Sequence, residues 1–79
     1  MHLKVLIVDD EPLARARLRT LLGDCRQPAV IVAGEAANAA QAMSHLQHSK
    51  VDVALIDIHM PGADGLALAR MVQSRLYYI

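Results

Sequence analysis

The strongest constraint on the fold is an alternation of short apolar runs with helical patterns. The apolar runs are Leu3–Val8, Ala29–Ala36 and Val51–Ile58. Each is short and contains β-branched residues, which is typical of strands buried in a sheet. The intervening segments are long enough to cross back over the sheet as helices. The order therefore predicts a parallel sheet covered by helices, with a core that is aliphatic because Tyr77 and Tyr78 are the only aromatic residues.

Two helices are predicted between these strands. The first covers Pro12–Leu22, with a proline in its first turn and Gly23 as the expected stop. Its expected inner stripe is Ala14, Leu18, Leu21 and Leu22. The arginines of this helix form no continuous stripe, so we expect them mainly to face solvent: Arg15, Arg17 and Arg19. The second helix is capped by Asn38 and runs to about Gln47, with an inner stripe of Ala39, Ala42, Met43 and Leu46.

The C-terminal part of the chain is less regular in its pattern. The loop "HMPGADG" is rich in residues that form turns. A third helix is predicted from Asp64 or Gly65 to Ser74. The final residues, "RLYYI", either begin a fourth strand or fray.

Acidic residues gather where two of the predicted strands end. Asp9 and Asp10 follow the first strand, and Asp57 closes the third. In the common strand order 2-1-3 these strands are neighbours, and ligands bind beyond the carboxyl ends of such strands. No lysine or arginine lies within two residues of either group, so the carboxylates favour a cation. For Glu11 we expect a helix cap and dipole partner rather than a ligand.

The chemistry of this predicted cluster favours a hard metal ion. Oxygen ligands suit Mg²⁺, with Mn²⁺ as an alternative, and the carboxylates are too few for a dehydrated calcium cage. A carboxylate beside such an ion can attack an activated phosphoryl group and become an aspartyl phosphate. The sequence therefore predicts a metal-assisted phosphoacceptor site.

Composition and charge exclude several other classes of function. The formal net charge is zero, so nothing draws this segment to nucleic acid. Cys25 is the only cysteine, which excludes an intramolecular disulfide and fits a reducing compartment. The N-terminus lacks a signal-peptide pattern, and no apolar stretch is long enough to span a bilayer. We therefore expect a cytoplasmic protein that does not contact membranes. His45 and His48, spaced i, i+3, lack a third ligand nearby and are expected to be solvated surface residues.

Two motifs together resemble a known family. "VLIVDDEP" and "VALIDIHMPGADG" are similar to the receiver domain of two-component response regulators. The starts "DDEPLARARLR" and "VAGEAANAAQA" further resemble receivers attached to LytTR-type DNA-binding domains. The resemblance implies an α/β, flavodoxin-like (CheY-like) parallel sheet in order 2-1-3 with helices on both faces. Residues 1–79 would be the N-terminal portion of such a domain, incomplete as β-α-β-α-β-α.

The resemblance also implies a role for each matching residue. Asp57 would be the phosphoacceptor and a metal ligand. Asp10 would ligate Mg²⁺ directly, Asp9 through water, and His59 through its main-chain carbonyl. The loop behind the site would be shaped by Met60, Pro61, Asp64 and Gly65. The implied partner is a sensor histidine kinase, with a small phosphodonor as another source, and a DNA-binding output domain is expected in a full-length protein.

Departures from the family pattern leave other functions open. A complete receiver has five βα units, and this chain has three. The Ser or Thr that ends the fourth strand of a receiver and the lysine that ends its fifth have no counterpart here. The third strand would then be an exposed edge, which predicts self-association through that edge. One alternative is thus a truncated receiver that acts only as an interaction module. Another is an aspartyl-phosphate hydrolase of the haloacid-dehalogenase type, but Asp57–His59 lacks the D-x-D pattern usual there.

Overall fold

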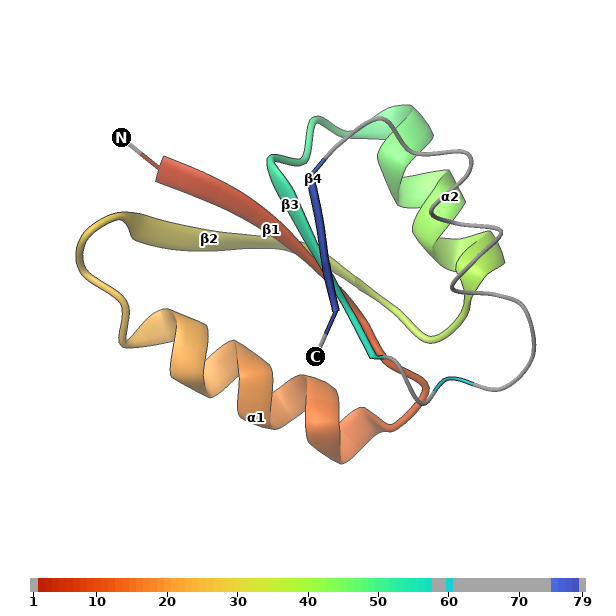
Figure 1. Ribbon diagram of the computed structural model, residues 1–79, viewed down its shortest axis with the longest axis horizontal. Coiled ribbons are helices and arrows are strands. Elements are labelled where there is room, and N and C mark those ends of the chain that lie inside the picture. The colour runs from red at the N-terminus through yellow and green to blue at the C-terminus, as the bar shows by residue number, and fades with distance from the viewer. Residues whose placement is uncertain (1, 58–59, 61–74, 79) are drawn as a thin grey trace.

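Four parallel strands form one sheet flanked by two described helices (Figure 1). The computed structural model describes residues 2–57, 60 and 75–78, the last four by their backbone alone. The elements in chain order are β1 (His2–Val8), α1 (Pro12–Gly23), β2 (Ala29–Ala36), α2 (Ala39–His48), β3 (Val53–Ile56) and β4 (Arg75–Tyr78). The sheet order is β2-β1-β3-β4, which confirms the predicted order 2-1-3.

The central strand β1 supplies side chains to both faces of the sheet, as the alternation of strand side chains requires. Val5 and Ile7 are buried on the face that α1 covers, together with Val53. Leu6 and Val8 are buried on the opposite face, where α2 packs. Figure 1 shows the two helices on opposite sides of the strands. The sheet is therefore doubly covered, as the apolar runs predicted.

Helix α1 begins at Pro12 as predicted and ends at Gly23, one residue later than expected. Leu18 and Leu22 pack against the sheet. The prediction that Leu21 lies on the inner stripe is wrong, because this side chain is 64% exposed. Leu21 and Leu22 are consecutive, so they point about 100° apart around the helix axis, and only one of them can face the sheet squarely.

Helix α2 has a complete N-terminal cap. The side chain of Asn38 accepts a hydrogen bond from the Gln41 backbone N–H at 2.8 Å, as a capping residue should. Gln41 Oε1 in turn accepts from the backbone N–H of Ala37 at 2.8 Å. Ala42 is buried, and Met43 and Leu46 pack against the same core cluster. The predicted inner stripe of this helix is thus confirmed at these three positions.

Strand β3 is shorter than its apolar run. It covers Val53–Ile56, whereas the run from Val51 was predicted to be strand throughout. Asp52 interrupts it by pairing with Lys4 of β1 in two ways: its backbone N–H donates to the Lys4 carbonyl, and its carboxylate accepts from the Lys4 N–H, each at 2.8 Å. The Asp52 carboxylate thus accepts the Lys4 N–H, which would donate to a backbone carbonyl of β3 if the strand began earlier.

The exposed third-strand edge expected from the sequence is absent. Strand β4 pairs in parallel with β3, from Val53 opposite Arg75 to Ile56 opposite Tyr78. Of the two alternatives for "RLYYI", the strand is therefore confirmed. The prediction of self-association through the edge of β3 assumed that this edge is exposed. That assumption is wrong, because β3 forms its backbone hydrogen bonds with β4 on this side. The predicted third helix lies outside the described residues.

Candidate metal centre

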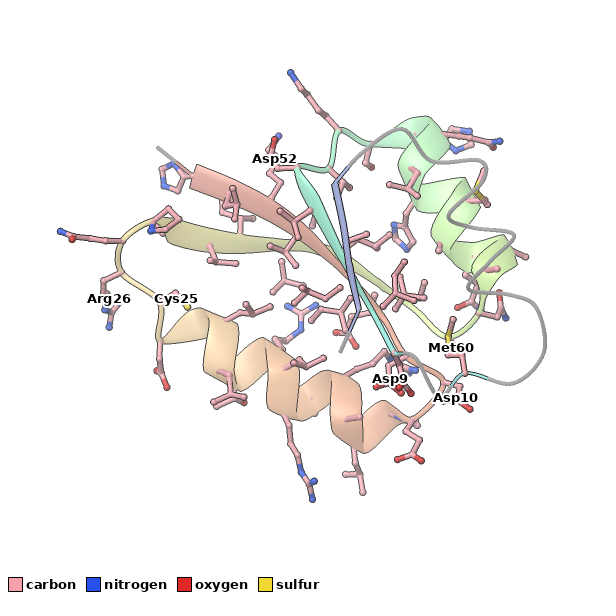
Figure 2. All side chains as sticks on the ribbon, in the orientation of Figure 1. Asp9, Asp10, Cys25, Arg26, Asp52 and Met60 are labelled. Carbon is pink, nitrogen blue, oxygen red and sulfur yellow. The ribbon has the colours of Figure 1, made fainter. Side chains whose placement is uncertain are left out.

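Three carboxylates meet at one end of the sheet. Asp9 and Asp10 follow β1, and Asp57 follows the neighbouring strand β3. One carboxylate oxygen from each residue lies within 4.8 Å of the others. Asp9 is buried, Asp10 is exposed and Asp57 is half-buried, so the cluster opens toward solvent at Asp10. The predicted convergence is confirmed. Figure 2 labels Asp9 and Asp10 at this end of the sheet.

The hydrogen-bond ladder of the sheet sets the positions of two of these carboxylates. The backbone N–H of Asp9 donates to the carbonyl of Ala36 in β2 at 2.9 Å. The N–H of Asp57 donates to the carbonyl of Val8 in β1, also at 2.9 Å. Each aspartate is therefore held as if its strand continued for one more residue, and its side chain projects from a rigid edge.

The carboxylate of Asp9 also shapes the entry to α1. Its Oδ1 accepts a hydrogen bond from the Glu11 backbone N–H at 2.9 Å, which forms a local turn. Glu11 occupies the N-cap position with extended backbone, as expected, but its side chain makes no capping hydrogen bond. One oxygen of Asp9 is thus engaged within the protein, which suits a more indirect contribution to a cation than that of the exposed Asp10.

Arg15 contacts the end of the sheet that carries the acidic cluster, and the sequence analysis did not predict this contact. Its Nη1 donates to the main-chain oxygen of Asp9 at 2.6 Å, and its Nε donates to Glu35 Oε1 at 3.1 Å. The side chain is 18% exposed, so the expectation that it faces solvent is wrong. Arg15 lies six positions from Asp9 along the chain, and one helical turn brings it back to the strand end, so closeness in sequence did not indicate this contact. The sequence feature that could have predicted this contact is a helix that starts directly after the acidic end of a strand, because the first turn of such a helix lies next to that end.

Glu35 is held by two arginines. Arg19 Nε donates to its Oε2 at 2.8 Å, and Arg19 Nη2 forms an ion pair with the same oxygen at 2.8 Å, whereas Arg15 contacts Oε1. The Arg19 hydrogen bond does most to lower the pKa of Glu35, and it is aided by the Arg19 charge and by Arg15. Burial acts in the opposite direction and only partly offsets these effects. Glu35 is therefore a carboxylate anchor for α1 on β2.

The other predicted residues differ in how far the structure describes them. Met60 is buried in the core cluster under α2, and its N–H donates to the Asp57 carbonyl at 3.4 Å. This places Met60 next to Asp57 of the acidic cluster; its predicted role in shaping the loop stays a prediction. The predicted contributions of four further residues lie outside the described part of the chain: His59, Pro61, Asp64 and Gly65.

The donor set of the cluster fits a hard divalent cation. Carboxylate oxygens are the ligands that Mg²⁺ and Mn²⁺ prefer, and Mg²⁺ retains several waters when one or two carboxylates bind it. The exposed Asp10 leaves room for such waters. The two histidines of α2 do not join a comparable group in the described residues: the Nδ1 of His48 contacts the Ser44 carbonyl at 2.8 Å, and His45 lies against Gly34.

Comparison with protein families decides the class of the chain. Residues 5–78 match the response regulator receiver domain. The chain belongs to this family. The resemblance drawn from the two motifs is thereby confirmed, and the parallel sheet in order 2-1-3 is the arrangement of this receiver fold. Within the described residues, neither helix of the receiver is long and apolar enough to cross a membrane.

Curated relatives of the receiver are mostly regulators. The transcriptional regulatory protein BtsR of Salmonella typhimurium is 46% identical over 70 residues, covering 89% of this chain and 28% of BtsR. The positive alginate biosynthesis regulatory protein of Pseudomonas aeruginosa is 44% identical over 73 residues, covering 92% and 29%. A protein-glutamate methylesterase/protein-glutamine glutaminase of Alkalilimnicola ehrlichii is 37% identical over 75 residues, covering 95% and 19%. The receiver thus spans less than a third of each of these relatives.

Solved structures share the fold. The isolated REC domain of RcsB from Salmonella enterica serovar Typhimurium, determined with phosphomimetic BeF₃⁻, matches with a TM-score of 0.78 at 27% identity, covering 99% of this chain and 59% of that domain. A chain from the complex of the P1 domain of CheA3 with CheY6 of R. sphaeroides matches with a TM-score of 0.74 at 29% identity, covering 96% and 60%.

Proposed function

We propose that this chain is a phosphorelay receiver module, the N-terminal portion of a receiver domain, and that Asp57 is its phosphoacceptor. The observation that carries the proposal is the grouping of the Asp9, Asp10 and Asp57 oxygens within 4.8 Å at the carboxyl ends of β1 and β3. Membership of the receiver family supports it. The BeF₃⁻-containing structure of the RcsB receiver supports a phosphoryl-like ligand for the fold.

In the proposed reaction, a carboxylate oxygen of Asp57 forms a bond to phosphorus. The P–N bond of a phosphohistidine, or the P–O bond of an acyl phosphate, breaks, and its electron pair leaves with the imidazole or the carboxylate. Asp57 is half-buried rather than buried, as a residue that a phosphodonor must reach should be. The Val8 carbonyl, by accepting the Asp57 N–H, keeps the Asp57 main chain at a fixed place on the sheet edge.

Asp10 and Asp9 would hold Mg²⁺, with Mn²⁺ as an alternative, and they differ in exposure. Asp10 is exposed and would bind the ion directly; Asp9 is buried, with one oxygen engaged by Glu11, and would act through water. The His59 main-chain carbonyl would complete the set, and Met60, Pro61, Asp64 and Gly65 would shape the loop. When bound, the ion offsets the negative charge that develops on the transferred phosphoryl oxygens.

The proposed partner is a sensor histidine kinase, and α1 offers a surface for it. Five exposed residues of α1 follow helical spacing on the face away from the sheet: Leu13, Ala16, Arg17, Thr20 and Leu21. Leu13 and Leu21 are 73% and 64% exposed. An apolar stripe of this kind suits packing against another helix. The complex of CheY6 with the CheA3 P1 domain supports a phosphotransfer partner for this fold.

Phosphorylation of the whole chain tests the proposal. Intact-mass spectrometry after incubation with acetyl phosphate and Mg²⁺ should show the gain of one phosphoryl group. Asp57→Asn should abolish the gain, whereas Asp52→Asn, at the opposite end of β3, should retain it. A chain that stays folded but gains no phosphoryl group would contradict the proposal and support the interaction-module alternative, which light scattering would then test as self-association.

Steady turnover of a phosphomonoester by the chain would instead support the aspartyl-phosphate hydrolase alternative.

The remaining part of a full-length protein and its location in the cell complete the proposed function. We propose that a DNA-binding output domain accompanies this receiver in a full-length protein, as the names of regulatory relatives suggest, and that this segment itself does not bind DNA because its net charge is zero. The cytoplasmic location expected from the sequence completes the proposal.

A further inference from the structure

Strand β2 holds Asp9 from both sides of its Cα. On the N-terminal side, the Asp9 N–H donates to the Ala36 carbonyl at 2.9 Å. On the C-terminal side, the Asp9 carbonyl accepts from Arg15 Nη1 at 2.6 Å, and Arg15 Nε donates to Glu35 at 3.1 Å. Glu35 and Ala36 are consecutive residues of β2. Two adjacent residues of one strand therefore fix both peptide groups of Asp9, one directly and one through Arg15.

The guanidinium group is suited to this bridge. It is planar and carries several N–H donors in a fixed arrangement, so it can serve Asp9 and Glu35 together. A lysine in the same place has a single ammonium group on a flexible stem and keeps the charge without the fixed geometry. We call the set Asp9, Arg15 and Glu35 the Arg15 bridge.

We propose that Arg15 is a positioning residue of the acidic cluster: through the Arg15 bridge it fixes the Asp9 peptide plane and thereby keeps the Asp9 carboxylate beside Asp10 and Asp57. The inference rests on the proposed function in one respect, the binding of Mg²⁺ at the cluster. Its structural part, the fixed turn from Asp9 to Glu11, is independent of the metal. That turn has a direct marker, the hydrogen bond from the Glu11 N–H to Asp9 Oδ1.

Arg19 provides a matched control for this role. It lies one helical turn beyond Arg15 and binds the same Glu35 carboxylate, but its hydrogen bonds in the described structure go to Glu35 and not to Asp9. If Arg15 served only to attach α1 to β2, loss of either arginine should have similar effects. If it served only as a positive charge near the cluster, its removal should strengthen cation binding, because like charges repel.

The test compares Arg15→Lys, Arg15→Met and Arg19→Met in the whole chain by NMR, after each is shown to fold. The first measurement is solvent exchange of the Glu11 amide proton without metal. We expect it to be about tenfold faster in both Arg15 variants, the factor that corresponds to the loss of about one hydrogen bond, and unchanged in Arg19→Met. The second is a Mg²⁺ titration followed at Asp9, Asp10 and Asp57. We expect about tenfold weaker binding in both Arg15 variants, as for residues that orient metal ligands, and no change in Arg19→Met.

Several outcomes would overturn the inference. Equal effects of the Arg15 and Arg19 variants would reduce Arg15 to an attachment of α1, and tighter Mg²⁺ binding by Arg15→Met would reduce it to a nearby charge. If the unaltered chain shows no Mg²⁺ response, the proposed metal site fails, and Glu11 exchange alone then decides the positioning role. Should the Arg15 variants not fold, Glu35→Gln weakens the same bridge more gently and is measured in their place, with the same expectations.

Discussion

The imidazole ring of His45 lies directly against Gly34, so that a Cβ at position 34 would stand 2.6 Å from His45 Cε1. This contact joins α2 to β2. It occurs where the pairing of β1 and β2 shifts: Val5 pairs with Val32 and Leu6 with Gly34, which leaves Ala33 as an extra residue. The close approach explains why a glycine stands at this place in a strand.

Gly34→Ala should destabilise the chain. The new methyl group must displace the His45 ring or shift β2. Because the ring is the end of a half-buried side chain, we expect a loss of about 1 kcal/mol, at the low end of the range for overpacking. Urea denaturation measures the loss. Gly23→Ala is the matched control, because nothing lies within 4 Å of a Cβ at that position. A double variant with His45→Ala should recover part of the loss. Equal stability of the two alanine variants would contradict the close packing of His45.

The stability conferred by Glu35 should depend on pH in a defined direction. Its pKa in the folded chain lies below the ordinary value of 4.5, chiefly because of the Arg19 hydrogen bond. The unfolded chain therefore takes up the proton more readily, and the stabilisation is present above about pH 4.5 and lost as the pH falls through the lower folded-state pKa. Urea denaturation of the unaltered chain and of Glu35→Gln should show a difference at neutral pH that shrinks in acid. A difference that grows in acid would refute the assignment.

Asp10→Asn should have opposite effects with and without metal. In a chelator, removal of one of three neighbouring carboxylates relieves repulsion, so the variant should be at least as stable as the unaltered chain. With Mg²⁺ at a hundredfold excess over its dissociation constant, the unaltered chain should gain about 2.7 kcal/mol, and the variant much less. Thermal unfolding with and without Mg²⁺ measures both effects. Asp24→Asn, at the far end of α1, is the control and should leave the Mg²⁺ effect intact.

Loss of the exposed leucines of α1 should impair the kinase reaction alone. The double variant Leu13→Ser and Leu21→Ser should retain most of its stability and its reaction with acetyl phosphate, because both side chains are exposed and belong to neither core cluster. Phosphotransfer from a histidine kinase should slow severalfold. By contrast, Leu18→Ala should cost about 2 kcal/mol of stability, the low end of the range for buried leucines, because that half-buried side chain packs on the sheet. An equal slowing with both donors would argue against a docking role.

Local patterns were sufficient for most of the elements. The start of α1 at Pro12 and the Asn38 cap of α2 depend on short-range chemistry, so a sequence reading finds them. The placement of Leu21 and the length of β3 were wrong for a different reason. The placement of Leu21 depends on which side of α1 packs against the sheet. The length of β3 depends on the hydrogen bond between Asp52 and Lys4, which are forty-eight residues apart along the chain.

The candidate site divides in the same way. The sequence by itself determined which carboxylates end β1 and β3, and parallel pairing of those strands was enough to predict that Asp9, Asp10 and Asp57 converge. Only the tertiary structure decided how Asp9 is held, because Arg15 and Glu35 come from two elements whose relative placement follows from packing. It likewise decided that β4 covers the edge of β3. Short-range sequence patterns predict strand ends and helix caps. Hydrogen bonds and ion pairs between separate elements depend on distances that only the folded chain sets.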